Sequence, residues 1–198
     1  MDSRDILTIK GLIRRGEART ASSYNNIPLD RVHFLDLPFY ETGKIQKNPI
    51  SEADVEIVRN LLREIKPHQI FVAGDLADPH GTHRVCTDAV FAAVDLEKEE
   101  GAKWLKDCRI WMYRGAWAEW EIENIEMAVP ISPEELRAKR NSILKHQSQM
   151  ESAPFLGNDE RLFWQRSEDR NRGTATLYDQ LGLASYEAME AFVEYIPL

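Results

Sequence analysis

Two cysteines, Cys86 and Cys108, are all that this chain of 198 residues contains, and no Cys-x-x-Cys spacing occurs. We therefore expect reduced thiols in or near the core of a cytoplasmic protein. The sequence also lacks an apolar run of membrane-spanning length, and its amino end lacks the pattern of a signal peptide. These absences predict a protein that has no membrane partner.

The sequence also has no excess of basic residues. Its 25 Lys and Arg are outnumbered by 33 Asp and Glu, which gives a formal net charge of -8. A broad surface that binds the phosphate backbone of a nucleic acid needs an excess of positive charge, so nucleic acid is not expected as a partner. Hydrophobic residues at 43% and charged residues at 29% are ordinary for a globular protein. Without repeats or low-complexity tracts, a single domain over residues 1–198 is predicted.

Hydrophobic periodicity predicts alternating helices and strands. Ser51 and Asp54 have the form of a capping box before a helix that Pro67 ends, and the apolar run Gln69–Ala73 that follows is typical of a buried parallel strand. With a strand over 31–37 this makes a βαβ unit with a right-handed crossover. Further strands are predicted over 108–114 and 125–131, and helices over 3–21, 82–94, 132–149 and 186–195.

The densest group of chemically active side chains follows the strand at 69–73, where Asp75, Asp78, His80 and His83 lie within nine residues. Ligands of open α/β sheets bind beyond the carboxyl ends of such strands. Neutral imidazole binds zinc, and a second histidine can act as an acid, a base or an oxyanion stabiliser. The alternative is that both histidines are surface residues and both aspartates only stabilise turns.

Aromatic and basic residues follow the strand predicted over 108–114. Two tryptophans, Trp117 and Trp120, could form with Tyr113 and Arg114 a wall on which a sugar stacks, with a cationic group for a carboxylate or phosphate. The alternative is that these aromatic side chains cover the edge of the sheet. His146, late in the helix predicted over 132–149, could face the cleft or only bond to a neighbouring loop.

Two segments carry a resemblance to a known family. The motif Asp78-Pro-His-Gly-Thr-His83 before a helix resembles the second signature of the LmbE/PIG-L zinc-dependent N-deacetylases, and residues 139–149 resemble that family's late helix with its His-x-Ser-Gln ending. The resemblance implies that His83 binds zinc and that His80 and Asp78 are catalytic. The whole chain resembles the deacetylase-like region that is fused behind glucosamine-6-phosphate deaminase in some bacteria.

This resemblance implies an α/β fold, a Rossmann-like three-layer αβα sandwich with a mostly parallel sheet. The family's first signature, an Ala-His-Pro-Asp-Asp-Glu-like loop with the other zinc ligands and the general base, is absent from the sequence. We therefore expect the sheet to be truncated at the amino end, lacking one strand, one helix and a second strand. The exposed edge or apolar surface is expected to be covered in a homo-oligomer or by a fused or associated deaminase domain.

Three functions follow. The first is a zinc-dependent N-deacetylase acting on an N-acetylated amino sugar of the GlcNAc type, with an incomplete zinc site and with Arg114, Tyr113, Trp117 and His146 binding the substrate. The second is a non-catalytic sugar-binding or assembly domain associated with glucosamine-6-phosphate deaminase. The third, the deaminase activity itself, is suggested only by how the fused proteins are named, and its motifs are absent from the sequence.

Overall fold

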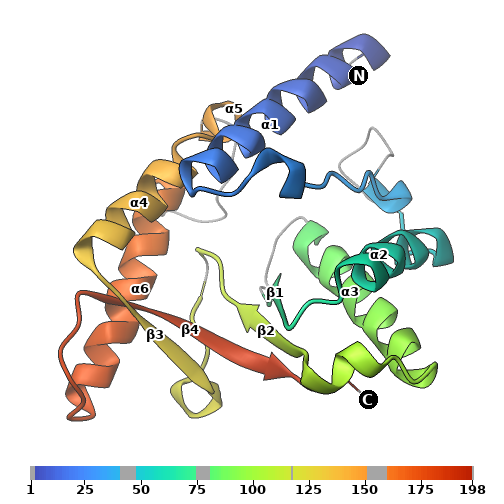
Figure 1. Ribbon diagram of the computed structural model, residues 1–198. Helices are drawn as coiled ribbons and strands as arrows, with labels where there is room; N and C mark the ends of the chain where they lie inside the picture. The colour runs from blue at the N-terminus through green and yellow to red at the C-terminus, as the bar shows by residue number, and fades with distance from the viewer. Residues whose placement is uncertain (1–2, 41–47, 75–80, 117, 151–159, 198) are drawn as a thin grey trace. The chain divides into compact units, whose positions relative to one another are not determined.

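The computed structural model describes residues 3–40, 48–74, 81–116, 118–150 and 160–197 (Figure 1). The chain divides into two compact units. The first, Met1–Phe34 with Pro130–Met189, holds most of the helices and is called the helical unit below. The second, Leu35–Val129 with Glu190–Leu198, is called the sheet unit.

Six α-helices and four strands make up the main regular elements of the described residues. The helices are α1 (Arg4–Tyr24), α2 (Glu52–Ile65), α3 (Thr82–Glu99), α4 (Pro133–Ile143), α5 (Gln147–Met150) and α6 (Phe163–Gln180). The strands are β1 (Gln69–Ala73), β2 (Arg109–Tyr113), β3 (Met127–Ile131) and β4 (Ala188–Tyr195), in the sheet order β1-β2-β4-β3. Among these described helices, none is both long and apolar enough to cross a lipid bilayer.

The sheet is mixed, and this corrects the expectation of a mostly parallel Rossmann-like sandwich. β1 and β2 run parallel, with Phe71 opposite Trp111, whereas β4 runs antiparallel to β2, with Val193 opposite Met112. The four-stranded sheet is mostly antiparallel, and the α/β class is confirmed. The antiparallel pairing arises because the last strand of the chain, β4, inserts between β2 and β3.

β4 also corrects the helix predicted over 186–195. The segment contains good helix formers, and Met189, Phe192 and Val193 have the spacing of one helix face. In the fold both edges of this segment pair with neighbouring strands, and its side chains are buried or half-buried on both faces. Backbone pairing and burial on two sides therefore outweigh the intrinsic helical preference.

The strand predicted over 31–37 is also wrong. A short 3-10 helix occupies Leu29–Arg31, and residues 32–37 form no regular structure. Asp36 adopts a left-handed backbone with φ of 50°, which interrupts an extended run. The βαβ unit of the fold is instead β1-α3-β2, in which α3 joins the two parallel strands.

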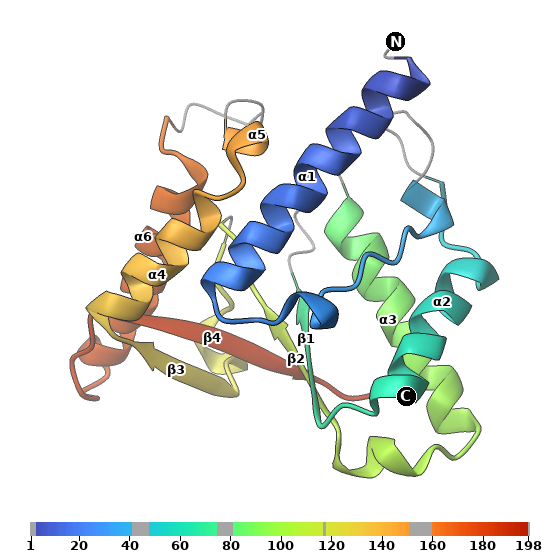
Figure 2. The ribbon, with the colours of Figure 1, turned by 45° about the horizontal axis from the view of Figure 1, so that its top comes forward.

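Two helices pack on the β1 and β2 strands to form the core of the sheet unit, where α2 and α3 lie side by side (Figures 1 and 2). The cluster includes Val58, Val72, Ala93 and Ile110. α2 begins with the predicted capping box, and Asp54 also accepts a hydrogen bond from the backbone N–H of Phe39 at 2.9 Å. The helix pair that supports β1 and β2 is thus fixed at the start of α2.

Ion pairs join the carboxyl-terminal halves of α2 and α3. Arg59 Nε of α2 donates to Glu97 Oε1 of α3 at 2.6 Å, and Arg63 Nε donates to the same oxygen at 2.6 Å. Both Arg59 and Glu97 are buried. Because a charge buried without its partner is costly, this pairing fixes how the two helices lie against each other.

Candidate functional site

The carboxyl ends of β1 and β2 form one corner of the sheet unit. The parallel pairing continues past the end of β1, because the backbone N–H of Gly74 donates to the carbonyl oxygen of Tyr113 at 2.8 Å. The residues that leave the two strands therefore start side by side. We call Gly74, Tyr113, Arg114 and Trp120 the strand-end cluster.

Gly74 lies under an aromatic ring. A Cβ atom at this position would be 2.6 Å from Cζ2 of Trp120 and 2.8 Å from Cβ of Met112. Real side chains do not approach this closely, so only glycine permits the indole to lie on the end of β1. The indole of Trp120 is half-buried there.

The guanidinium of Arg114 lies over this indole, with Cζ 3.9 Å from the ring centroid of Trp120. Such cation–π stacking holds the arginine in place and leaves its planar group suited to a carboxylate or phosphate. Tyr113 next to it is 37% exposed. Burial and the nearby carboxylate of Glu190 raise the pKa of the Tyr113 phenol, which keeps it a hydrogen-bond donor at neutral pH.

α3 begins close to the same corner. Gly81, with φ of 65°, precedes it, and the hydroxyl of Thr87 donates to the carbonyl oxygen of Ala73 at 2.7 Å. His83 lies one turn before Thr87 on the same face of α3, because residues four apart in a helix are neighbours. Its side chain is exposed.

Several predicted site residues fall outside the described part of the chain. They are Asp75, Asp78, His80 and Trp117, and their predicted roles stay predictions. Within the described ranges, no group of three or more His, Cys, Asp and Glu side chains could hold a metal ion. The described residues therefore do not make a zinc site by themselves, and His83 is the one predicted ligand among them.

His146 belongs to the helical unit, in the short connection between α4 and α5. Its backbone N–H donates to the carbonyl oxygen of Ile143 at 3.0 Å, and its side chain is half-buried. The ring atom Nδ1 is buried and has no hydrogen-bond partner among the described residues. The imidazole can therefore accept or donate a further hydrogen bond, and its predicted role in substrate binding stays a prediction.

Both tryptophans of the run that leaves β2 were candidates for the stacking wall, and only Trp117 was assigned to substrate binding. The structure places Trp120 in the cluster. The signal was present, because both tryptophans occur in the run that leaves β2. Which indole approaches the end of β1 depends on how this run turns back over Gly74, and sequence spacing does not give that path.

Two solved structures resemble this chain, whereas no family model matches it. The first is GalB, the 4-carboxy-2-hydroxymuconate hydratase from Pseudomonas putida KT2440, with a TM-score of 0.64 and 14% identity over 94% of this chain and 72% of that chain. The second is the deacetylase of the teicoplanin biosynthesis pathway, with a TM-score of 0.54 and 17% identity over 93% of this chain and 73% of that chain. The chain has an LmbE-like fold.

The LmbE-like fold agrees with the resemblance of the two sequence segments, whereas the mostly parallel sandwich that the resemblance implied is not confirmed. Identities of 14% and 17% show the fold alone, since one fold hosts many reactions, and the two neighbours are themselves a hydratase and a deacetylase. The expected fusion to a deaminase and the expected loss of the amino-terminal strands stay predictions.

Replacing Gly74 tests the packing of the strand-end cluster. We expect Gly74→Ala to displace the indole of Trp120, to change the tryptophan fluorescence and to lower the free energy of unfolding by about 1–3 kcal/mol, as overpacking does. The matched control is Gly173→Ala in α6, where an added Cβ meets nothing within 4 Å and should be neutral or stabilising. Urea denaturation measures both, and equal stability of the two variants would contradict the packing described here.

Proposed function

We propose that this chain is an N-deacetylase-like domain that binds an N-acetylated amino sugar of the GlcNAc type at the strand-end cluster. The observation that supports this is the stack of Arg114 on Trp120 beside the partly exposed Tyr113, at the carboxyl ends of two parallel strands. Ligands of open α/β sheets bind at this position.

The side chains of the cluster suit a sugar. The indole of Trp120 already lies between Gly74 and Arg114, so the exposed ring of Tyr113 is the one that can contact the apolar C–H face of a pyranose. Its phenol can donate a hydrogen bond to a hydroxyl or carbonyl oxygen. The fixed guanidinium of Arg114 provides a positive charge for a 6-phosphate or a carboxylate. The deacetylase among the structural neighbours supports the reaction class.

Hydrolysis of the acetamide would require zinc, with His83 as a metal ligand and His80 and Asp78 as catalytic residues. His83 suits this role because it is exposed on the face of α3 that Thr87 ties to the end of β1. A catalytic zinc site has about three protein ligands, and the described residues contribute this one. Catalysis therefore depends on ligands that would have to come from outside the described residues.

A second candidate is a non-catalytic sugar-binding or assembly domain associated with glucosamine-6-phosphate deaminase. The observation in its favour is the strand-end cluster itself, whose side chains can contact a sugar without a metal ion. This candidate expects sugar binding at the strand-end cluster without release of acetate.

Replacing Arg114 tests the sugar site that both candidates share. We expect Arg114→Gln to weaken binding of N-acetylglucosamine 6-phosphate about tenfold or more, because a charge-assisted hydrogen bond to the phosphate is lost. Arg109→Gln is the matched control, since Arg109 lies at the opposite end of β2 and is exposed. Titration calorimetry measures both affinities, and an equal affinity of the two variants would contradict the proposed site.

Zinc content separates catalysis from binding alone. For a deacetylase we expect about one zinc ion per purified chain, lost in His83→Ala and kept in His68→Ala, together with acetate release from N-acetylglucosamine or its 6-phosphate. His68 is a suitable control because it is exposed just before the amino end of β1. A folded chain that binds the sugar without zinc or acetate would exclude the deacetylase and leave the second candidate.

Assembly with further copies of this chain is part of the proposal. α1 exposes Ile6, Ile9, Leu12 and Ile13, each between 44% and 62%. Apolar residues clustered on one helix are typical of surfaces that partner chains cover. We expect sedimentation velocity to show an oligomer that Leu12→Glu disrupts and that Leu181→Glu, at a residue with 64% exposure elsewhere, does not. A monomeric parent chain would contradict this.

A further inference from the structure

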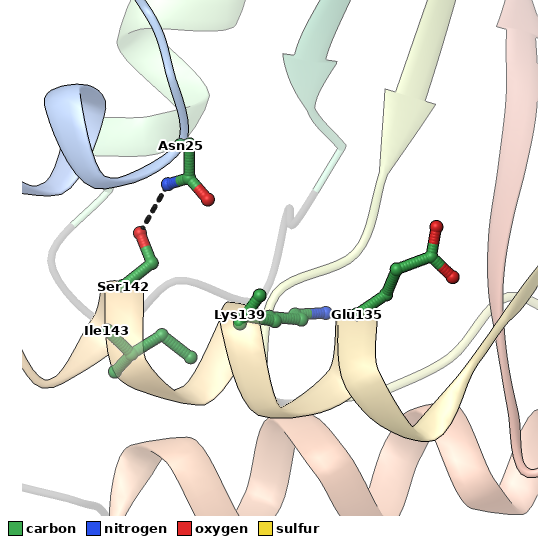
Figure 3. A pocket seen from close by; sticks show the side chains of 6 residues that line it. Asn25, Glu135, Lys139, Ser142 and Ile143 are labelled. Atoms are coloured by element: carbon green, nitrogen blue, oxygen red, sulfur yellow. Dashed lines mark hydrogen bonds between the residues drawn. The ribbon is translucent and has the colours of Figure 1, made fainter.

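A hollow lies within the helical unit, on the surface of α4 (Figure 3). Its volume is about 380 Å³, toward the lower end of the range of ligand pockets. We call it the α4 hollow. It is lined by Asn25, Glu135, Ala138, Lys139, Ser142 and Ile143.

The spacing of the lining residues follows from the geometry of α4. Positions 135, 138, 139, 142 and 143 recur at three and four residues and therefore share one helix face. Leu136 and Arg140 lie beside this face, and Arg140 pairs with Glu168 of α6. The face that carries the hollow combines polar side chains with the apolar Ala138 and Ile143.

Hydrogen bonds hold the polar groups of the α4 hollow in place. Asn25, at the carboxyl end of α1, donates from Nδ2 to Ser142 Oγ at 2.7 Å, as Figure 3 shows. Lys139 Nζ donates to Oδ1 of Asn171 at 2.7 Å, and the fully buried Asn171 donates in turn to the carbonyl oxygen of Met189. The ammonium is therefore positioned by a buried amide.

The other polar side chains of the α4 hollow can each form one more hydrogen bond. Within the described residues, Asn25 Oδ1 accepts no hydrogen bond and the Ser142 hydroxyl donates none. Glu135 Oε2 accepts from both the backbone N–H and the hydroxyl of Ser132, which leaves Oε1 without a donor in the same described set. These hydrogen bonds hold the pKa of Glu135 below its usual range, so it carries a negative charge at neutral pH.

The charges of the α4 hollow decide the class of ligand. The charges of Lys139 and Glu135 cancel. An anion in the hollow would be repelled by Glu135, and a cation would be repelled by Lys139. A hydroxyl group both donates and accepts, and it satisfies acceptors such as Asn25 Oδ1 and donors such as the Ser142 hydroxyl equally well. Ala138 and Ile143 offer apolar contacts for C–H groups.

We infer that the α4 hollow is a binding site for a neutral polyhydroxylated ligand of monosaccharide size. Its lining residues all belong to the helical unit, so this site is separate from the strand-end cluster of the sheet unit. It requires neither a metal ion nor an acetyl group. The inference therefore goes beyond the proposed function, and either one can be wrong while the other holds.

The test is an NMR titration of the full chain, labelled with ¹⁵N, with methyl glucoside as the probe. We expect saturable shifts of the Asn25 side-chain amide and of the Ser142 and Lys139 backbone amides. Ala138→Phe, which fills the hollow, should weaken binding at least about tenfold. Ser142→Ala should weaken it about threefold to tenfold, as expected for one hydrogen bond.

Matched variants separate this site from the rest of the chain. Ser23→Ala, an exposed serine in the last turn of α1, should leave the affinity unchanged, and so should Arg114→Gln in the strand-end cluster. Circular dichroism confirms that each variant is folded. Three results would overturn the inference. They are no shifts with methyl glucoside, shifts that persist in Ala138→Phe, and shifts that appear only with free glycine or inorganic phosphate as the probe.

Discussion

The parallel pairing of β1 with β2 is the constraint on which the sheet unit depends. Parallel neighbours cannot be joined by a tight turn, so the chain between them must cross over, and it does so through α3. The same pairing places the carboxyl ends of both strands at one corner. Gly74 extends it by one hydrogen bond to Tyr113, and the strand-end cluster assembles around that point.

Close approach at Gly74 has consequences for the chemistry of the cluster. Since no Cβ separates the strand from the indole of Trp120, the ring approaches the strand end closely, and Arg114 lies over it. A guanidinium held in this way loses little conformational freedom when it binds an anion. Ligand recognition at the cluster therefore depends on a backbone position that contacts no ligand itself.

The helical unit is organised differently, around polar groups that are buried and paired. Asn171 has no exposed surface, and its amide joins Lys139 of α4 to the backbone at Met189. Arg140 and Glu168 make a bidentate pair between α4 and α6. Polar pairing of this kind fixes the register of two helices, and through Lys139 it also fixes one side of the α4 hollow.

The sequence by itself determined the local elements that have strong signals. The helix that begins at the capping box of Ser51 and the apolar strand Gln69–Ala73 were predictable. Caps, proline stops and hydrophobic periodicity act within a few residues. The LmbE-like fold was also predictable from two short motifs, but the direction of the strands was not, because β4 inserts into the sheet from a distant part of the chain.

Tertiary structure alone decided the rest. The segment Ala188–Tyr195 became a strand because two neighbouring strands satisfied its backbone, and no local preference reports such a distant partner. For the same reason sequence spacing did not show that Trp120 approaches the end of β1. It also gave no sign of the pair Asn25 and Ser142 in the α4 hollow, which are 117 residues apart in the chain and joined by one hydrogen bond. Contacts between remote segments depend on how the chain folds back on itself, and that path is a property of the whole fold.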